Sequence, residues 1–430
     1  MTSLSDCTTH GNILTHLFSH NLGHDSSTTV SLLNETTLGN HQDLQKGRIL
    51  KGTPDRSFRP KKMSRDFLDI DGSAMEGGGQ ILRMSVGLSA LLRRPIRIAK
   101  IRGGRAKPGL QAQHLNGIQL VAGISEGSSL SGAAKDSLQI DFAPGKTLRG
   151  GRYEADMRTA GSTCLLAQAS LPCLLFADRE SRLDLRGGTD AKMAPPVGYY
   201  VSVFRRNLNK FGADFDFEVA RKGYFPRGGG QLILTVPPVR SLRPVTMTEM
   251  GDVTKVTVTA SVAGSLPVSL AQEMAGAARE TLKRSGVIKC EIAVEAYKEE
   301  RATGSGSSVW IVCETSTGCV LGGSEVGSNK ERPRLTGEAA ARALLDSLEL
   351  RPCVDEHMQD QVVVLMALAA GRSRVRAGPL TLHTETAIHI ARAISGAEFR
   401  VEKAEDGSGA VIIECDGIGL ENDSAASGDA

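Results

Sequence analysis

Strand-like and helix-like segments alternate along most of this chain, and that alternation limits the possible folds more than any other feature of the sequence. Between residues 67 and 394, segments that alternate apolar and polar residues, or are rich in Val and Thr, are interleaved with segments of helical spacing. Interleaved strands and helices pack as layers, so the pattern predicts an α/β or α+β fold. With 430 residues, 40% of them hydrophobic, the chain can form two or three domains with sizeable cores.

The individual elements can be placed from periodicity and from helix-breaking residues. Pro95 and Gly371 are expected to end helices, and Pro172 to lead from a helix into a strand. The expected helices cover residues 81–92, 115–124, 162–171, 355–370 and 384–394. The expected strands cover residues 67–70, 96–101, 173–177, 255–261 and 309–314, with a strand end at 380–383.

One tetrapeptide occurs twice. Gly77–Gln80 and Gly228–Gln231 both read Gly-Gly-Gly-Gln, and an apolar pair follows each. A chain with 48 glycines can repeat four residues by chance, so the echo is weak by itself. It fits a fold built from repeated α/β units.

The two ends of the chain differ in composition from the middle. Residues 1–65 are rich in Ser, Thr, Asn and His without sustained periodicity, which predicts a disordered extension, with a targeting or metal-binding segment as the alternative. Acidic residues within this segment argue against a mitochondrial transit peptide, and Arg59–Lys62 resembles a weak nuclear signal. Residues 421–430 are polar and are expected to form a flexible tail.

Composition excludes several classes of protein. The net charge of +3 rules out a polycationic nucleic-acid binder, so any such contact must come from a local patch. Aromatic residues make up only 4%, which argues against a platform of several stacked aromatics. No apolar run reaches about 18 residues, so no membrane-spanning helix is expected. The eight cysteines form no Cys-x-x-Cys pair and are typical of buried thiols in a reducing compartment.

His383 is the most informative of the four histidines that follow residue 65. It lies where a strand is expected to end and a helix to begin. The free N–H groups and positive dipole of a helix N-terminus favour an anion such as phosphate. The same field disfavours an imidazolium and keeps one ring nitrogen unprotonated, as attack on phosphorus requires. A capping or core histidine is the alternative.

Other polar residues are candidates with structural alternatives. His357, Asp360 and Gln361 share one helix face and could line a nucleotide pocket or form a solvated first turn. Residues 93–107 carry seven basic side chains and no acid, which suits phosphate contacts but also an exposed strand and loop. Glu76 could hold a divalent metal. No Walker loop follows Gly79, because the Gly-Lys-Ser/Thr sequence is missing.

Eight ordered motifs together resemble the RNA 3'-terminal phosphate cyclase family, and most closely its eukaryotic true-cyclase branch. The similarity runs from about Phe67 to Leu420. The motifs are Asp71–Arg83, Lys107–Leu110 with Gln113–Leu115, Thr159–Ser162, Arg186–Thr189 with Met193–Pro195, Gly223–Gly230, Asp360–Gln361, Gly378–Thr384 and Glu414–Gly419.

The resemblance implies a domain organisation. It implies a large domain of three repeated units, each a four-stranded sheet with two helices, at residues 66–247 and 349–420. A smaller α/β domain is inserted at about residues 248–348.

The resemblance also implies a reaction. A histidine attacks the α-phosphorus of ATP, AMP passes to the RNA 3'-phosphate, and the neighbouring 2'-hydroxyl closes a 2',3'-cyclic phosphate with release of AMP. Such covalent catalysis divides one difficult step into easier ones. The implied partners are RNA with a 3'-terminal phosphate and a divalent metal, Mg²⁺ or Mn²⁺.

Site residues follow by motif match, with His383 as the nucleophile. The residues matched to ATP binding are Gln168, Pro195, His357, Asp360, Gln361 and His383. Those matched to the terminal phosphate or active site are Arg83, Arg102, Arg105, Gln113 and His114. Glu76 matches a metal-associated position.

One departure and two competing functions remain. Close relatives often carry Tyr where this chain has His357, and histidine keeps a flat ring and a polar tip at that position. The family also contains a cyclase-like branch that lacks the nucleophile and serves ribosome assembly; the presence of His383 favours the enzyme. An enolpyruvyl transferase has repeated units of related shape but lacks these motifs. The expected location is the nucleoplasm, with the cytoplasm as an additional site.

Overall fold

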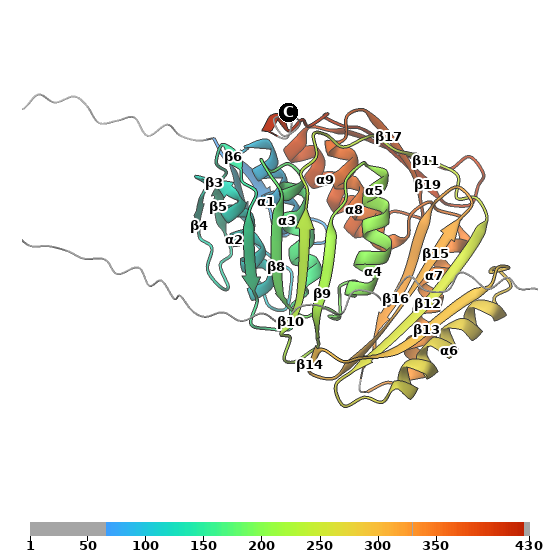
Figure 1. The fold of residues 1–430 in the computed structure, drawn as a ribbon. Coiled ribbons are helices and arrows are strands. Elements are labelled where there is room, and N and C mark those ends of the chain that lie inside the picture. The colour runs from blue at the N-terminus through green and yellow to red at the C-terminus, as the bar shows by residue number, and fades with distance from the viewer. Residues whose placement is uncertain (1–65, 329, 425–430) are drawn as a thin grey trace, which may run out of the picture. The chain divides into compact units, whose positions relative to one another are not determined.

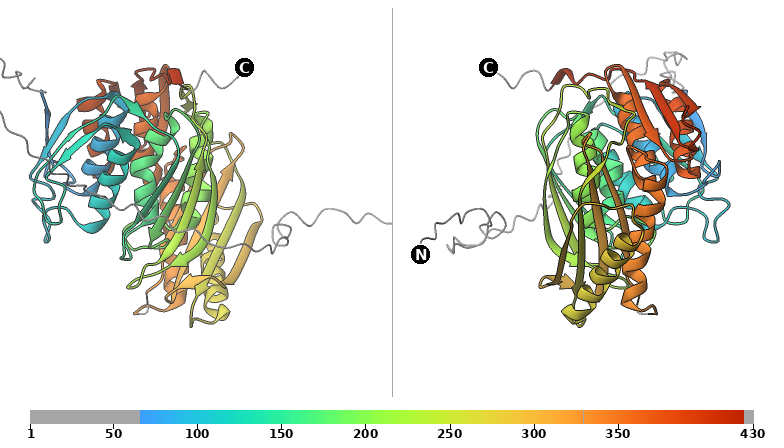
Figure 2. Two further views of the ribbon diagram at one scale, coloured as in Figure 1. Left: turned by 60° about the vertical axis from the view of Figure 1, so that its left-hand side comes forward. Right: turned by 90° about the vertical axis from the view of Figure 1, so that its right-hand side faces the viewer.

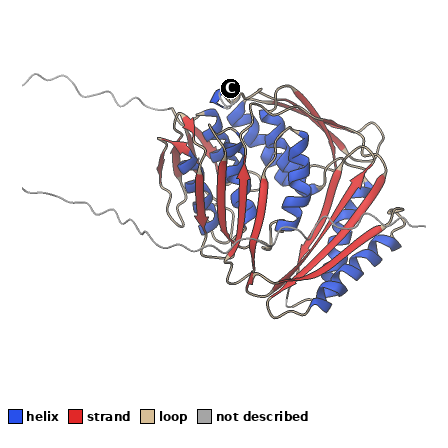
Figure 3. Cartoon of the chain, viewed as in Figure 1, coloured by secondary structure: helices blue, strands red, loops and turns tan. Residues whose placement is uncertain are grey.

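The structure, a computed structural model, describes residues 66–328 and 330–424. The expected N-terminal extension and most of the expected C-terminal tail lie outside these residues. The described residues belong to one compact unit within Met63–Ala430, in which strands and helices alternate along the chain (Figures 1 and 3). The predicted mixed α and β class is confirmed. No helix among the described residues is both long and apolar enough to cross a bilayer.

The first sheet has the strand order β1-β2-β5-β4. Its strands are β1 (Leu68–Asp71), β2 (Ile96–Ala99), β4 (Ser129–Ser131) and β5 (Ile140–Ala143). Strands β1 and β2 are parallel and are connected by helix α1 (Gly79–Leu92), while α2 (Ala112–Ile124) follows β2. A separate two-stranded ribbon pairs β3 (Ser125–Glu126), which follows α2, with β6 (Thr147–Leu148), which follows β5.

The second sheet has the order β14-β9-β10-β8-β7. Its strands are β7 (Arg152–Asp156), β8 (Ser181–Gly187), β9 (Asp216–Gly223), β10 (Gly230–Val236) and β14 (Ala302–Thr303). Helix α3 (Thr163–Leu175) connects the parallel strands β7 and β8. A continuous helical segment of α4 (Val197–Tyr199), the π-helical turn η1 (Tyr200–Phe204) and α5 (Arg205–Lys210) leads to β9.

The third sheet has the order β11-β17-β19-β18. Its strands are β11 (Thr246–Met247), β17 (Arg372–Ala377), β18 (Glu398–Lys403) and β19 (Val411–Asp416). Helix α8 (Glu356–Leu368) precedes β17, and α9 (Leu382–Ser395) follows it. Four strands of each of these three sheets share one pairing pattern, a parallel pair followed by two antiparallel pairs.

A fourth sheet lies between β11 and α8 in the sequence and has the order β13-β12-β15-β16. Its strands are β12 (Val253–Ala263), β13 (Ile292–Glu299), β15 (Gly306–Thr315) and β16 (Val320–Val326). Helices α6 (Val268–Arg284) and α7 (Pro333–Glu349) pack on it and enclose a core separate from the main one. Strand β14 leaves this segment and pairs with β9, so it adds a fifth strand to the second sheet.

The helices that belong to the first three sheets form the main hydrophobic core together. Helix α1 packs against α2, α3 and α9, and α8 packs against α9, so the sheets lie outside a shared group of helices (Figures 1 and 2). A helix that follows a strand of a parallel pair runs back antiparallel to it, so its N-terminus lies at that strand's carboxyl end. Hydrogen bonds of side chains and backbone between different helices bring the beginnings of α1, α8 and α9, and those of α2 and α3, together.

The expected strand at residues 173–177 is wrong. Helix α3 continues to Leu175 with Pro172 inside it. Proline cannot donate the hydrogen bond to the carbonyl of Gln168, which normally weakens a helix. Here Leu171, Leu174 and Leu175 are all buried, and burial of about three large side chains offsets the loss of one backbone hydrogen bond.

The expected strand end at residues 380–383 is also wrong. The preceding strand, β17, ends at Ala377, and Thr381 already caps α9. Strand β17 was not predicted because arginines occupy three of its six positions. Two of those arginines, Arg372 and Arg374, pair with Glu414 of the neighbouring strand β19, a contact that only the sheet creates.

The two Gly-Gly-Gly-Gln segments are not equivalent in the fold. Gly77–Gln80 leads from β1 into helix α1, whereas Gly228–Gln231 leads from a turn into strand β10. The repeated tetrapeptide therefore does not mark corresponding positions of the first two sheets.

Candidate functional site

The first turn of α9 holds His383 at a capped helix N-terminus. The Thr381 side chain accepts a hydrogen bond from the backbone N–H of Thr384 at 3.1 Å. The Thr384 hydroxyl donates to Oε1 of Gln359 on α8 at 3.0 Å. The backbone under His383 is thus fixed from two helices while its side chain is exposed.

Gln80 on α1 fixes the tautomer of the His383 ring. The Gln80 amide nitrogen donates to Asp360 Oδ2 at 2.7 Å, which leaves the amide oxygen facing His383 Nδ1 at 3.1 Å. Because that oxygen can only accept, Nδ1 must carry the proton. His383 Nε2 then keeps its lone pair and is free to act as a nucleophile.

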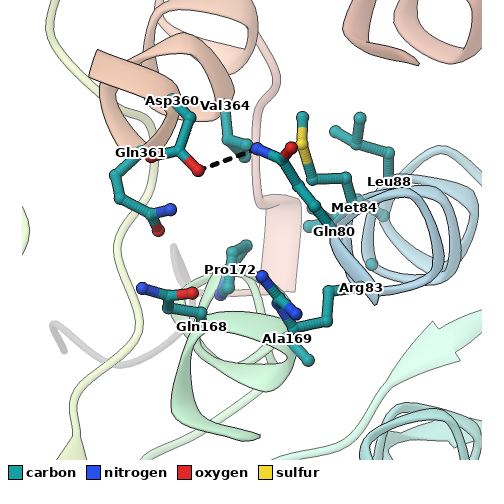
Figure 4. Close-up of a pocket in the computed structure, with 12 residues that line it drawn as sticks. Gln80, Arg83, Met84, Leu88, Gln168, Ala169, Pro172, Asp360, Gln361 and Val364 are labelled. Carbon is teal, nitrogen blue, oxygen red and sulfur yellow. Dashed lines mark hydrogen bonds between the residues drawn. The ribbon is translucent and has the colours of Figure 1, made fainter. Parts of the chain in front are cut away.

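A pocket opens next to this contact, between α1, α3 and α8 (Figure 4). Figure 4 shows the side-chain ends of Arg83, Gln168 and Gln361 facing one common space. The walls are apolar: Met84, Leu88, Leu91 and Val364 line them. An apolar recess with a few convergent polar groups is the usual form of a small-ligand site.

The pocket contains a positive charge without an acidic partner, which suits an anionic ligand. Arg83 has no hydrogen bond or ion pair within residues 66–328 and 330–424, and burial lowers its pKa although Asp360 and Glu76 oppose that shift. Burial raises the pKa of Asp360, against the hydrogen bond with Gln361 and the nearby charge of Arg83. A guanidinium without an acidic partner at this pocket favours a ligand with anionic oxygens.

Glu76 lies in the loop before α1 and is held by Arg105. The guanidinium of Arg105 contacts Glu76 Oε1 and donates to the Glu76 backbone oxygen at 2.9 Å. The second carboxylate oxygen, Oε2, is buried and has no hydrogen-bond partner in the described part of the chain. A buried carboxylate oxygen without a partner suits a cation ligand.

His114 lies in the first turn of α2 and is kept neutral. Burial, with the charges of Arg102 and Arg83, lowers its pKa to about 4. Its Nδ1 accepts the backbone N–H of Gln111 at 3.2 Å, so the proton of the neutral ring is on Nε2. An added methyl group at Gly79 would lie 2.4 Å from His114 Nε2 and 3.2 Å from an Arg83 nitrogen, which shows how closely both side chains approach the start of α1.

Comparison with known proteins decides the family. The family model for RNA 3'-terminal phosphate cyclase matches residues 74–401. A protein named RNA 3'-terminal phosphate cyclase from Pyrobaculum aerophilum is 41% identical over 351 residues, covering 81% of this chain and 98% of the relative. One of the same name from Drosophila melanogaster is 38% identical over 357 residues, covering 83% and 98%. This chain belongs to the RNA 3'-terminal phosphate cyclase family.

The structure brings only some of the residues matched to this cyclase family into the pocket. Arg83, Gln168, Asp360 and Gln361 line it. Pro195 does not, and neither does His357, whose ring lies edge-on to Tyr199 with 5.9 Å between ring centroids.

The remaining matched residues support loops around the pocket. Arg102 donates to the backbone oxygens of Lys107 and Gly109 at 2.6 and 3.0 Å. Gln113 Oε1 accepts from the backbone N–H of Ser162, the N-cap of α3, at 2.7 Å. The candidate cyclase site thus extends from α9 through α1 and α2 to the start of α3.

The basic segment 93–107 is less free than its sequence suggests. Arg97 pairs with Asp141, Lys100 with Asp71, and Arg105 with Glu76. The acids come from other segments, so counting charges along the chain could not find them.

Gln80 is the site residue that sequence reasoning missed. Its position in a glycine-rich motif was visible, but glutamine has no titratable group to mark it. The sequence signal for it is a glutamine that follows a glycine run directly at the start of an expected helix; its contact with His383 is visible only in the structure.

Proposed function

We propose that this protein converts an RNA 3'-terminal phosphate to a 2',3'-cyclic phosphate with ATP as cosubstrate. The observation that carries the proposal is His383, with Nδ1 bonded to Gln80 and Nε2 free, beside a pocket that contains the unpaired cation Arg83. Family membership supports it, because relatives across most of this chain are named for that activity.

The first step forms a bond between His383 Nε2 and the α-phosphorus of ATP. The bond from that phosphorus to the bridging oxygen breaks, and pyrophosphate leaves with the electron pair. The Gln80 oxygen accepts from Nδ1–H and so stabilises the positive charge that develops on the ring. Gln168 and Gln361 offer amide groups for the nucleotide.

The next steps use the RNA end. An oxygen of the RNA 3'-phosphate attacks the adenylate phosphorus, the P–N bond breaks, and a phosphoanhydride forms. The 2'-hydroxyl then attacks the RNA phosphorus, its proton passes to solvent, and AMP leaves. Neutral His114 presents Nε2–H, and Arg83 adds positive charge, so both are suited to bind phosphate oxygens in these steps.

Glu76 is the residue proposed to hold a divalent cation, Mg²⁺ or Mn²⁺. Its buried Oε2 fits one metal ligand, but the described residues contain no group of three or more His, Cys, Asp or Glu that could complete a site. Phosphate oxygens and water would supply the rest, as is usual for Mg²⁺. Such a cation would neutralise charge on the phosphates.

Labelling with ATP tests the proposal. Protein incubated with ATP labelled at the α-phosphate and a divalent metal should acquire an acid-labile, alkali-stable label, as a phosphoramidate does. His383→Ala should abolish labelling, and His389→Ala is a matched control because His389 is an exposed residue of the same helix. A label that persists in His383→Ala would remove the nucleophile. A complete lack of adenylate in the unmodified protein would favour a non-enzymatic ribosome-assembly factor.

We further propose that the large domain consists of three repeated units at residues 66–247 and 349–420, with the smaller domain inserted at 248–348. The fourth sheet has the same pairing pattern as the first three, so the division is supported by its separate core and by the core that the helices of the first three sheets share. The nucleus, with the cytoplasm as an additional location, remains our proposal from the sequence.

A further inference from the structure

Three loops pack together at the carboxyl edge of the second sheet, next to the candidate site. The loop after β7 (158–162) and the loop after β8 (188–196) meet where the N–H of Gly188 donates to the oxygen of Gly161 at 2.6 Å. The turn after β9 (224–229) packs on the first loop so tightly that a methyl group at Gly228 would lie 2.3 Å from the Thr159 oxygen. The first loop joins the site through the Ser162–Gln113 hydrogen bond.

Two large apolar side chains at this edge are almost fully exposed. Phe225 is 81% exposed and Met193 is 96% exposed. These are the highest values among the exposed large hydrophobic residues of the described chain. Phe225 lies in a tight turn with its ring exposed to water. A ligand with a flat face that covers the ring would therefore gain the free energy of burying it.

The same three loops also carry three basic side chains. Arg158, Lys192 and Arg227 are exposed, one in each loop, and none forms an ion pair within the described ranges. In contrast, the basic segment 93–107 pairs three of its cations with acids of the protein. All three loop cations therefore remain available to the phosphates of a ligand.

The backbone of two of these loops is in a conformation that non-glycine residues rarely adopt. Arg158 has φ of 51° and Met193 has φ of 65°. Left-handed backbone at such residues costs free energy and is retained mainly where function needs the side chain in that position.

We propose that this surface, formed by Arg158, Lys192, Met193, Phe225 and Arg227, binds the single-stranded RNA segment upstream of the reacting 3' end. A base stacks on Phe225, Met193 packs beside it, and the three cations contact backbone phosphates. Stacking on one ring does not depend on base identity, so the surface does not select a sequence. It favours a single-stranded RNA end over a mononucleotide, which has no upstream segment to bind. The inference rests on the proposed function for its substrate and adds where the rest of that substrate lies.

Direct binding tests this surface separately from catalysis. Fluorescence anisotropy would measure the Kd of a 3'-phosphorylated oligoribonucleotide of about ten nucleotides, within the usual footprint of single-strand binders. Phe225→Ala should raise the Kd about tenfold or more, and Phe225→Trp should retain binding. Phe217→Ala is the matched control, because Phe217 is an exposed phenylalanine near the start of β9, the strand that precedes the turn holding Phe225.

Salt dependence provides a second measurement that does not depend on the Phe225 variant folding well. Arg227→Ala and Lys192→Ala should each reduce the slope of log K against log salt concentration by about 0.7, the value for one phosphate contact on a single strand. None of the variants should change labelling by ATP, since the loops do not line the pocket.

The outcomes separate the two proposals. Unchanged RNA affinity in Phe225→Ala, together with unchanged salt slopes, would overturn the RNA surface even if His383 becomes labelled. Absence of labelling with Phe225-dependent RNA binding would instead overturn the reaction and keep the surface.

Discussion

At the scale of single residues, the candidate site depends on amide and imidazole groups whose roles follow from their partners. Gln80 contacts both Asp360 and His383, and only this double contact sets the orientation of its amide. His114 has its proton placed in the same way, by the backbone N–H of Gln111. A site built from fixed tautomers needs little reorganisation when charge develops on a substrate.

Replacement of Gln80 should slow adenylylation without unfolding the protein. Gln80→Leu removes the acceptor for His383 Nδ1–H, and loss of one hydrogen bond that strengthens as the ring gains charge corresponds to about a tenfold slower reaction. Single-turnover labelling would measure the rate. Gln231→Leu is the matched control, because Gln231 occupies the other Gly-Gly-Gly-Gln segment and bonds to Asp184 instead. Equal loss in both variants would contradict a specific role for Gln80.

His114 should make stability depend on pH in acid. The unfolded histidine has a pKa of 6.5 and the folded one about 4, so protonation favours the unfolded chain. The free energy of unfolding should therefore fall as pH drops from 6.5 toward 4, by at most on the order of 3 kcal/mol from this group. Urea denaturation across that range should show a shallower fall in His114→Gln. An unchanged slope would show that His114 is not held neutral.

At the scale of elements, the site forms where helices begin. Thr381 caps α9, Ser162 caps α3 and Asp355 caps α8, each with its side chain accepting a backbone N–H of the first turn. Gly79 begins α1 next to His114 and Arg83. The N-termini of these helices thus provide a positive potential. They also bring together side chains from helices that belong to different sheets.

Two glycine-to-alanine changes should have opposite effects. Alanine normally stabilises a helix by about 1 kcal/mol relative to glycine. Gly123→Ala in α2 should show that gain in thermal unfolding, because nothing lies within 4 Å of the added methyl group. Gly79→Ala should not, since its methyl group would lie 2.4 Å from His114 Nε2 and must displace the ring.

Titration of His114 by NMR would identify the cause of the Gly79 effect. Displacement toward solvent should raise the His114 pKa from about 4 toward its ordinary value of 6.5. An unshifted titration in Gly79→Ala would mean that the ring does not depend on this glycine.

At the scale of the whole described unit, buried polar contacts join the second sheet to the fourth. Lys222 on β9 lies 3.4 Å from Asp190, and both side chains are buried. Its ammonium also donates to Ser261 on β12 at 3.2 Å and lies 5.0 Å from the ring centre of Trp310 on β15. Because Asp190 follows β8 of the same sheet as Lys222, the contacts of this buried ammonium with Ser261 and Trp310 are the ones that join the second sheet to the fourth.

Removal of Lys222 should be strongly destabilising. Lys222→Met leaves Asp190 buried without its cation, which costs about 3–5 kcal/mol. The double change Lys222→Met with Asp190→Asn should recover part of that loss, since no charge remains. Denaturant unfolding of both single variants and the double variant would measure the coupling. Additive losses would show that the two residues act independently.

The sequence by itself determined the fold class, several of the strands and helices, the family and the candidate nucleophile. Hydrophobic periodicity, helix-breaking residues and ordered motifs are local features of the sequence. They can be recognised without knowing which segments contact one another. Only the tertiary structure decided that Pro172 lies inside a helix, that three of the seven cations in the basic segment 93–107 pair with acids, and that Gln80 orients His383. Each of these depends on a partner distant in the chain, since burial and hydrogen bonding are set by which segments meet.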